Sequence, residues 1–426
     1  MNSTTDIICV EGCHALSGSI DVQGAKNSVL KLMAASILAP GSTTITNAPL
    51  ISDVLLMGEV LKCLGAKVSY GQGEIRIDSS TIDSHYAPYE LVSQMRASIA
   101  VLGPLLGRFG SAVVAMPGGC NLGARQIDMH FSALEALGVE FSTAAGNIVA
   151  TAPQGLHGAS VHLSFPSVGA TENVMMAAVC AKGTTIVENA AREPEISDLG
   201  EYLGEMGAKI VGLGSPIIRI EGTDKLYPVA CHKTIGDRIE AGTFLVAGAL
   251  MGGPLTVRGV RPAQLECALL KLEDMGVSVT RGDDSITVAR LRPLIATDIQ
   301  TLPFPGFPTD LQPQFMVLCA LADGKSTIAE NIFENRFVFT EEFARMGADV
   351  VVHGHFAQLQ GVSGLSAVPV KAPDLRGGAA LVLAGLAAEG YTKVSEVVHI
   401  DRGYEGFTDK LASLGAKIRR QPLEDA

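Results

Sequence analysis

The chain has 426 residues, of which 47 % are hydrophobic and 18 % are charged, so it can bury a large core and is not a disordered protein. Acidic residues (44) outnumber basic residues (32), which argues against general nucleic-acid binding because that requires neutralisation of phosphates. Eight cysteines without CxxC or zinc-type spacing exclude a disulfide scaffold and predict a reducing, cytoplasmic location.

The N-terminal segment has neither the basic nor the apolar region of a signal peptide. We expect one strand at about residues 7–22. The longest apolar stretches, at 244–251 and 381–388, are too short to span a membrane, so no membrane partner is expected.

From residue 41 onward, one pattern recurs six times. Each segment opens with a glycine and a β-branched run, continues through a helical stretch, and closes on Leu-Gly or Met-Gly before another strand. The closing glycines recur every 68 to 73 residues and are Gly65, Gly138, Gly207, Gly276, Gly347 and Gly415. Internal repetition of this kind predicts six similar structural units.

Each unit reads as a strand, a helix and a strand pair. Runs such as GSTTI, GTTIV and GKSTI predict strands, and the closing glycine suits a helix C-terminus. In the first unit Val54, Met57, Val60, Leu61 and Leu64 have helical spacing. A second helix, rich in small residues, is expected in each unit at 26–38, 89–106, 167–181, 238–251, 310–322 and 376–388.

Six units divide into three plus three, which predicts two domains with a ligand site in the cleft between them. The boundary is expected near 229–236, and the N-terminal strand can complete either domain. The alternative is two ordinary α/β domains with chance similarity.

A proline- and glycine-rich loop at 117–125 interrupts the second unit and carries Cys120. A thiol beside Arg125 can be reactive, because positive charge stabilises the thiolate. Cys9, Cys63, Cys180, Cys267 and Cys319 are instead expected to be buried packing residues.

Several cations occur where segments join, in a chain that is acidic as a whole. Lys26 lies at the start of a predicted helix, where it and backbone N–H groups suit an anion, although a solvated lysine is the alternative. The arginines at these places are Arg96, Arg125, Arg336, Arg376 and Arg402. Each alone is explained by an exposed arginine, but together they favour a shared anion site.

Asp310 precedes a predicted helix and is either an N-cap or a general base near this cationic group. Asp237 and Glu240 are expected to form a helix cap or an ion pair. The nine histidines show no metal-ligand spacing, and His353 and His355 are expected to be polar residues at a strand edge.

These motifs together resemble the UDP-N-acetylglucosamine 1-carboxyvinyltransferases, enolpyruvyl transferases of peptidoglycan synthesis within the EPSP synthase superfamily. The resemblance runs almost end to end. Its most specific segments are GAKN (24–27), MRAS (95–98), PGGCNLGAR (117–125), SVGAT (167–171), ENAAREPEI (188–196), DRIEAGTF (237–244), FPTD (307–310), IFENRF (332–337), DLR (374–376) and DRGYE (401–405).

The fold that this resemblance implies is an α/β protein, a two-domain inside-out barrel built from six βαβαββ units with the active site in the interdomain cleft. One domain then spans 24–232. The other spans 1–23 and 233–426, with the N-terminal strand completing it.

The implied reaction transfers the enolpyruvyl group of phosphoenolpyruvate to the 3′-hydroxyl of UDP-N-acetylglucosamine and releases phosphate, with no metal or organic cofactor. By resemblance Lys26, Asn27, Arg125 and Arg402 bind phosphoenolpyruvate, Cys120 is the general acid, and Asp310 is the base; Lys26 and Arg402 also assist catalysis. Arg336, Asp374 and Arg376 support the site.

The same resemblance assigns a set of residues to the sugar nucleotide. They are Asn27, Arg96, Arg125, Gln126, Ile127, Asp128, Met129, Phe165, Pro166, Ser167, Val168, Gly169, Asp310 and Ile332. Gln126 and Phe165 depart from the proline and lysine that other members carry there. Cys120 also implies susceptibility to the epoxide fosfomycin.

Two other functions are open on the sequence: an enolpyruvyl transferase acting on shikimate 3-phosphate, and a non-catalytic paralogue that binds the sugar nucleotide. The Cys120 loop and the SVGAT segment disfavour the first. The presence of Lys26, Cys120, Asp310 and Arg402 together disfavours the second. The sequence does not determine the oligomeric state.

Overall fold

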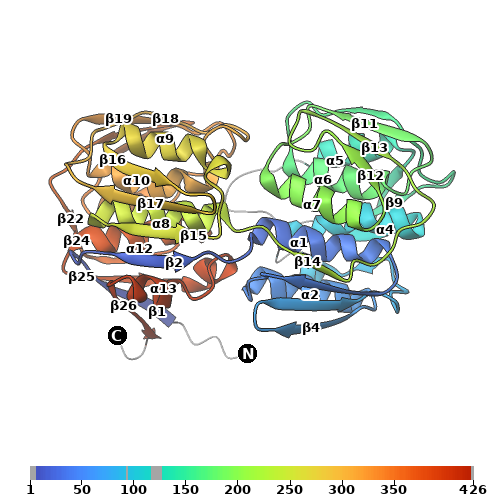
Figure 1. The fold of residues 1–426 in the computed structure, drawn as a ribbon, viewed down its shortest axis with the longest axis horizontal. Helices are drawn as coiled ribbons and strands as arrows, with labels where there is room; N and C mark the ends of the chain where they lie inside the picture. The colour runs from blue at the N-terminus through green and yellow to red at the C-terminus, as the bar shows by residue number, and fades with distance from the viewer. Residues whose placement is uncertain (1–5, 93–94, 117–126, 424–426) are drawn as a thin grey trace. The chain divides into compact units, whose positions relative to one another are not determined.

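The structure, a computed structural model, describes residues 6–92, 95–116 and 127–423. Contacts divide the chain into two compact units (Figure 1). The described residues from 24 to 235 form the N-terminal unit, and residues 6–23 and 236–423 form the C-terminal unit. The chain leaves the N-terminal unit after 235, beyond the expected 232, because Thr234 N donates to Thr46 O (3.0 Å) and Asn47 Nδ2 donates to Thr234 O (2.9 Å).

The described part of the N-terminal unit holds three four-stranded sheets of one design. One edge strand of each sheet pairs parallel with its neighbour, and the remaining pairings are antiparallel. The sheet orders below begin with that edge strand. The strands, in sheet order, are β14 (Cys231–Lys233), β3 (Ser42–Thr46), β5 (Glu74–Asp78) and β4 (Lys67–Gly71); β6 (Tyr86–Ala87), β7 (Ser111–Ala115), β9 (Asn147–Thr151) and β8 (Glu140–Ala144); and β10 (Ser160–His162), β11 (Thr184–Glu188), β13 (Ile217–Glu221) and β12 (Lys209–Val211).

The C-terminal unit repeats this design, and its described residues also form a two-stranded sheet of β22 (Leu365–Ser366) and β24 (Ala388–Glu389). Its four-stranded sheets run β2 (Gly18–Asp21), β15 (Leu255–Arg258), β17 (Ser285–Arg290) and β16 (Val277–Arg281); β18 (Ile299–Gln300), β19 (Lys325–Ala329), β21 (Phe356–Gln360) and β20 (Asp349–His353); and β23 (Pro369–Lys371), β25 (Tyr391–Ser395), β1 (Asp6–Glu11) and β26 (Lys417–Pro422).

The N-terminal segment forms two strands where the sequence predicted one. β1 pairs antiparallel with β25 and β26, in the position that the second strand of a hairpin occupies in the other sheets, and β2 pairs parallel with β15. The chain passes Gly12 between them, where a Cβ atom would lie 1.7 Å from the carbonyl oxygen of Ala388. Only glycine allows this close approach, and the next residue, Cys13, has a φ of +65°, which an extended strand does not adopt, so the predicted strand is broken here.

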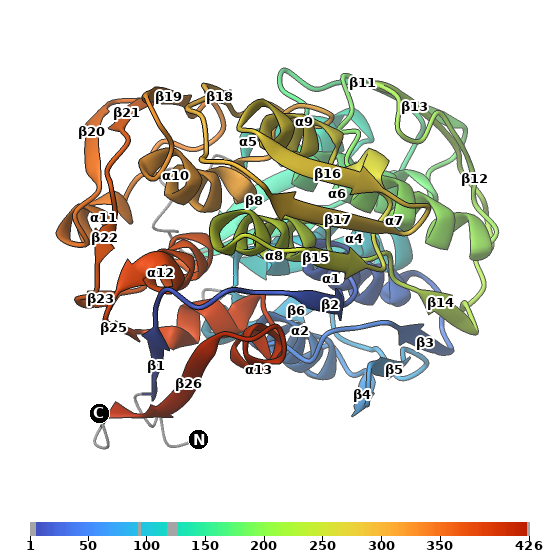
Figure 2. The same ribbon diagram turned by 60° about the vertical axis from the view of Figure 1, so that its left-hand side comes forward.

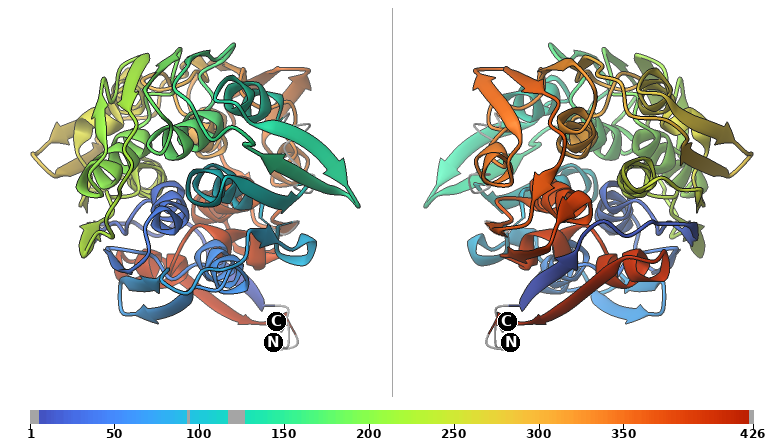
Figure 3. Two further views of the ribbon diagram at one scale, coloured as in Figure 1. Left: turned by 90° about the vertical axis from the view of Figure 1, so that its right-hand side faces the viewer. Right: turned by 90° about the vertical axis from the view of Figure 1, so that its left-hand side faces the viewer.

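Two sets of helices differ in burial. One set is enclosed by the sheets of its own unit (Figures 1 and 2): α1 (Lys26–Ala35), α4 (Leu102–Phe109) and α6 (Val168–Ala178), and α8 (Arg238–Met251), α10 (Gln312–Ala320) and α12 (Leu375–Ala387). All nine residues of α10 are buried. The end views in Figure 3 show helices inside and strands at the periphery of each unit.

The second set buries only part of its surface and lies near the unit's outside: α2 (Ser52–Cys63), α5 (Asp128–Ala136), α7 (Pro194–Glu205), α9 (Glu266–Asp274), α11 (Thr340–Arg345) and α13 (Phe407–Ser413). The apolar residues predicted to face the core from α2, at 54, 57, 60, 61 and 64, are all fully buried. Each unit has its own hydrophobic core.

The repeat pattern predicted from the sequence is confirmed. The six closing glycines have φ between +87° and +106°, a range that L side chains rarely adopt. Each of them follows a helix of the second set and precedes a strand. The fold is therefore the α/β arrangement of six similar units that we expected.

One predicted helix differs. Residues 89–106 were expected to form a single helix, but the described residues there form α3 (Tyr89–Val92), the 3-10 helix η2 (Arg96–Val101) and α4. Pro104 has no N–H to donate to the carbonyl of Ala100, which an uninterrupted α-helix would need. Gly103 N instead donates to Asn173 Oδ1 (2.8 Å) on α6.

Candidate functional site

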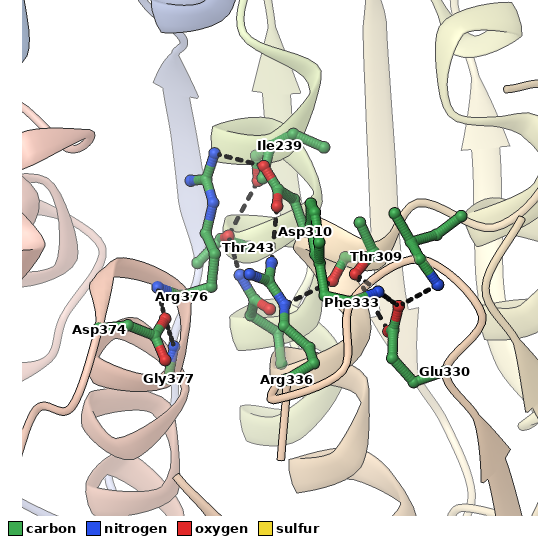
Figure 4. A network of polar contacts seen from close by, with 12 residues as sticks. Ile239, Thr243, Thr309, Asp310, Glu330, Phe333, Arg336, Asp374, Arg376 and Gly377 are labelled. Atoms are coloured by element: carbon green, nitrogen blue, oxygen red, sulfur yellow. Dashed lines mark hydrogen bonds and ion pairs between the residues drawn. The ribbon is translucent and has the colours of Figure 1, made fainter. Parts of the chain in front are cut away.

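Asp310 is the centre of a polar cluster in the C-terminal unit (Figure 4). It lies in the 3-10 helix η4 (Thr309–Leu311), directly before α10, so it is not the N-cap of α10. Its Oδ1 accepts from Arg336 Nη2 at 2.6 Å and its Oδ2 accepts from Arg376 Nη2 at 3.1 Å. The Asp310 side chain keeps 24 % of its surface exposed, so a substrate group can still reach it.

The two arginines are almost completely buried. Arg336 is 2 % exposed and also donates from Nε to Thr309 O (3.2 Å), while its guanidinium lies over the ring of Phe333. Arg376 is 3 % exposed and lies over the ring of Tyr404. Since arginine does not lose its proton in the accessible pH range, the Asp310 carboxylate keeps two permanently charged partners.

Asp374 contributes to the cluster indirectly. Its Oδ1 accepts from Arg376 N (2.8 Å) and Gly377 N (3.0 Å), which makes it the N-cap of α12. The cap fixes the first turn of α12, from which the Arg376 side chain reaches Asp310. Asp237 caps α8 in the same way through Ile239 N and Glu240 N, as the sequence predicted.

Glu330 holds the neighbouring loop that carries Ile332 (Figure 4). Its buried carboxylate accepts from Thr309 Oγ1 (3.0 and 3.1 Å), from Ile332 N (2.9 Å) and from Phe333 N (3.1 Å). Glu330 therefore joins the loop of Ile332 to the turn of Asp310. Sequence reasoning missed it; its place directly after the strand β19 was the available signal.

Arg402 ends the 3-10 helix η5 (Val397–Arg402) and is half-buried. Asp401, beside it, accepts from Arg420 Nη1 (2.7 Å) and Nη2 (2.9 Å), and Arg420 Nε donates to Asp6 Oδ2 (2.7 Å). These contacts tie the turn of Arg402 to strands β26 and β1.

In the N-terminal unit, Lys26 is the first residue of α1. Its Nζ lies 2.6 Å from Asp53 Oδ2, and the Asp53 side chain is only 4 % exposed. Asn27, beside it, is exposed. The structure thus gives Lys26 a buried carboxylate partner, which the sequence analysis did not identify.

One turn further along α1, Lys31 pairs with the buried Glu172 of α6. Burial is the main cause that raises the pKa of Glu172 to about 7, although Lys31 opposes the rise. Sequence reasoning missed this pair. Both residues are charges inside an apolar helical stretch, the signal that singled out Arg96.

The expected nucleotide residues of the described chain lie at the starts of two helices. Ile127, Asp128 and Met129 begin α5, and the segment 165–169 leads into α6, where Ser167 Oγ accepts from Ala170 N at 3.3 Å. His130 on α5 contacts α6 in two places. Its Nδ1 lies 2.9 Å from Asn173 Nδ2, and a Cβ atom at Gly169 would come within 3.2 Å of its ring.

Comparison with known proteins identifies the family. A family model described as EPSP synthase (3-phosphoshikimate 1-carboxyvinyltransferase) matches residues 10–411 of the chain. The chain belongs to this family.

Two curated relatives are named UDP-N-acetylglucosamine 1-carboxyvinyltransferase. The protein from Trichlorobacter lovleyi is 48 % identical over 97 % of this chain and 99 % of its own length. The protein from Mycobacterium leprae is 52 % identical over 96 % of this chain and 98 % of its own length.

Solved structures of the family agree with the fold. The enolpyruvyl transferase NikO from Streptomyces tendae gives a TM-score of 0.88 at 26 % identity, with 98 % of this chain and 99 % of that chain covered. An EPSP synthase from Acinetobacter baumannii gives 0.75 at 18 % identity, with 98 % and 100 % covered, and shares the fold.

Part of the site expected from the family resemblance lies outside the described residues. This applies to Cys120, Arg125 and Gln126, and to the side chain of Arg96. Within the described residues, the structure brings Asp310, Arg336, Asp374 and Arg376 into one cluster and places Lys26 against Asp53.

The other cysteines differ partly from expectation. Cys9 and Cys319 are buried, but Cys63 is exposed and Cys180 and Cys267 are only partly buried. The prediction for Cys63 was wrong because it lies at the C-terminal end of α2, on the side that faces away from the core. His353 and His355 are exposed, as expected.

Searches of the described residues for two other features gave negative results. No group of three or more His, Cys, Asp or Glu side chains in this part of the chain is arranged to hold a metal ion. None of its helices combines the length and apolar character needed to cross a membrane.

Proposed function

We propose that this chain transfers the enolpyruvyl group of phosphoenolpyruvate to the 3′-hydroxyl of UDP-N-acetylglucosamine and releases phosphate. The observation that carries the proposal is the identity of 48 % and 52 %, over nearly the whole chain, to relatives that bear the name of this activity. The EPSP synthase structure is only 18 % identical, which disfavours shikimate 3-phosphate as the acceptor.

Asp310 is the proposed base for the sugar hydroxyl. Two of the lone-pair sites of its carboxylate are used by Arg336 and Arg376, so at least one site remains for a hydroxyl proton. The arginines orient the carboxylate through both oxygens before the substrate binds. Such preorganisation lowers the barrier because the groups need not reorganise during the reaction.

Phosphoenolpyruvate carries a carboxylate and a phosphate, and therefore requires several cations. We assign Lys26, Asn27, Arg125 and Arg402 to it, with Lys26 and Arg402 also assisting catalysis. Because Lys26 is paired with Asp53, its charge is partly offset before the anion binds. The substrate phosphate has to compete with Asp53 for Lys26, or share Lys26 with it.

In the proposed addition, the hydroxyl oxygen bonds to C2 of phosphoenolpyruvate and its proton moves to Asp310, while the Cys120 thiol protonates C3. In the elimination that follows, a C3 proton is lost and the C2–phosphate bond breaks, which leaves an enolpyruvyl ether.

We assign the sugar nucleotide to Asn27, Arg96, Arg125, Gln126, Ile127, Asp128, Met129, Phe165, Pro166, Ser167, Val168, Gly169, Asp310 and Ile332.

The deciding experiment measures phosphate release from phosphoenolpyruvate with UDP-N-acetylglucosamine and, in parallel, with shikimate 3-phosphate. Release with the sugar nucleotide alone supports the proposal. Release with shikimate 3-phosphate supports the alternative transferase. Binding of the sugar nucleotide without release under either condition supports a non-catalytic paralogue.

The acid role of Cys120 has its own test. The variant Cys120→Ala should abolish phosphate release at neutral pH, because no other group is assigned to protonate C3. Near-normal turnover of this variant would reject the role. With Cys120 present we also expect inactivation by fosfomycin, and we place the reaction in the cytoplasm, at the first committed step of peptidoglycan synthesis.

A further inference from the structure

Tyr404 occupies a position in the C-terminal unit that the roles assigned so far do not use. It lies two residues after Arg402 and is 2 % exposed. The guanidinium carbon of Arg376 lies 5.3 Å from the centre of its ring, and the ring of Phe407 packs at 4.8 Å. Tyr404 therefore contacts the arginine that holds Asp310 and belongs to the turn that carries Arg402.

The hydroxyl of Tyr404 is held by two helices. Its Oη lies 2.9 Å from Thr243 Oγ1 on α8 and 3.3 Å from Gln314 Nε2 on α10. Thr243 Oγ1 donates its own proton to Ile239 O at 2.9 Å and accepts from Gln314 Nε2 at 3.1 Å. The proton between the two hydroxyls therefore comes from Tyr404, and the direction of the network is fixed.

The phenol remains a donor throughout the working pH range, because burial raises the pKa of Tyr404 above its ordinary value. The backbone adds a second attachment, since Tyr404 N and Gly403 N both donate to Ile400 O at 3.1 Å. The turn around Arg402 is thus tied to the helices inside the unit at Tyr404.

We propose that Tyr404 is a positioning residue that couples Arg402 to Asp310: its ring supports Arg376 against Asp310, and its hydroxyl anchors the turn of Arg402 to α8 and α10. This inference rests on the proposed function, because it assigns Asp310 to the acceptor hydroxyl and Arg402 to phosphoenolpyruvate. Residues that act through others affect rate when geometry loosens by about an ångström.

The test is Tyr404→Phe, which keeps the ring over Arg376 and removes only the hydroxyl. Gln314 still has Thr243 as acceptor, and Thr243 still donates to Ile239 O. Arg376, which also hydrogen-bonds the Tyr404 hydroxyl, keeps Asp310 as its partner. We expect kcat/KM for phosphoenolpyruvate to fall about tenfold to a hundredfold, with changes in both kcat and KM. The KM for UDP-N-acetylglucosamine should stay within about twofold of wild type.

Tyr202→Phe is the matched control. Tyr202 is also completely buried, and its hydroxyl lies 3.5 Å from Thr43 Oγ1, in the N-terminal unit. Both variants should lose a few degrees of Tm at most, but only Tyr404→Phe should lose activity. An equal effect of the two variants on phosphoenolpyruvate kinetics would overturn the inference.

Thr243→Val supplies a second probe, because it removes the acceptor of the Tyr404 proton while keeping a β-branched shape. It should reproduce the kinetic loss, and Gln314 Nε2 then still has the Tyr404 hydroxyl as acceptor. A Thr243→Val variant without kinetic loss, or a Tyr404→Phe variant within twofold of wild type, would contradict the coupling. A wild-type chain inactive with both acceptors would instead reject the proposed function.

Discussion

In the C-terminal unit, one carboxylate, Asp310, lies between two buried arginines. In the described part of the N-terminal unit, Lys26 and Lys31 are each paired with a buried carboxylate, and His232 lies between Asp198 and Glu205. The first set is built on arginines, whereas the second is built on lysines and a histidine, each paired with carboxylates.

The difference shows which of the two networks responds to pH. Arginine keeps its proton at any pH at which the protein is folded, so the C-terminal cluster presents a constant field. In the N-terminal unit, the pKa of Glu172 is raised to about 7, mainly by burial. Burial by itself lowers the pKa of His232, but its hydrogen bonds to Asp198 and Glu205 raise it above 6.5.

The largest effect is expected from Asp310→Asn, which removes the carboxylate that both buried guanidinium groups contact. Removing one partner of a buried ion pair costs about 3–5 kcal/mol of unfolding free energy. Loss of the proposed base should lower kcat by about 10²–10⁴-fold. Urea unfolding and phosphate release measure the two effects separately.

Asp374→Asn is the matched control for that variant. It makes the same chemical change at the N-cap of α12, where asparagine caps a helix as well as aspartate. We expect Asp374→Asn to lower the unfolding free energy by less than about 0.5 kcal/mol. If Asp310→Asn kept turnover within twofold of wild type, the base would have to be another group.

A smaller, pH-dependent effect is expected from Lys31→Met. The variant leaves Glu172 buried without its cation, but Glu172 can take up a proton because burial raises its pKa. The cost should be about 2–3 kcal/mol at pH 8 and clearly less at pH 6. Lys62→Met, at an exposed ion pair on α2, is the control and should cost little at either pH.

A Lys31→Met penalty that is the same at both pH values would contradict this account. It would mean that Glu172 does not exchange a proton in this range. Thermal unfolding at the two pH values, with wild type and Lys62→Met alongside, decides the point.

Glu172→Gln tests the carboxyl itself. Because its pKa in the folded chain (about 7) exceeds its ordinary value of 4.5, the folded state binds the extra proton between these values. Unfolding free energy therefore falls as the pH rises through this interval, by about 2–3 kcal/mol. Glutamine has no such proton, so the variant should lose this slope.

The control for the slope is Glu188→Gln at an exposed position of β11, which should keep the wild-type pH dependence. The measurement is unfolding free energy from urea titrations between pH 5 and pH 8. A Glu172→Gln variant with an unchanged slope would show that another group titrates.

The sequence predicted the fold better than it predicted the contacts of charged residues. The repeat period, the β-branched runs and the closing glycines depend on local backbone preferences, so they could be located from spacing alone. The pairing of Lys26 with Asp53, or of Arg376 with Asp310, joins residues from separate elements, and no local pattern specifies it.

Two failures have particular physical causes. Within the segment expected as one helix at 89–106, the chain changes from 3-10 to α near Pro104, which removes a backbone donor that apolar periodicity does not register. The single strand expected at 7–22 is broken after Gly12, where the carbonyl of Ala388, far along the chain, leaves room for glycine alone and Cys13 takes a φ of +65°. The second cause is tertiary and is not visible in the segment itself.

The smallest expected effect belongs to His232, which lies on β14, the last strand of the N-terminal unit. When charged, its ring donates toward Asp198 (3.2 Å) and Glu205 (3.0 Å), and Asp198 also accepts from Ser28 Oγ on α1. Since the pKa of His232 is higher in the folded chain than its ordinary value of 6.5, this contribution is fully present below pH 6.5 and is lost as the pH rises through the folded-state pKa. His232→Asn should therefore cost about 1 kcal/mol at pH 6 and less at pH 9. Hydrogen exchange of the amides of β14 and β3 should show the difference. The control is His162→Asn, at an exposed histidine of β10, which should leave the exchange of those amides unchanged at both pH values. Equal protection in wild type and His232→Asn at pH 6 would remove His232 from the pH-sensitive network and leave Glu172 as its titrating group.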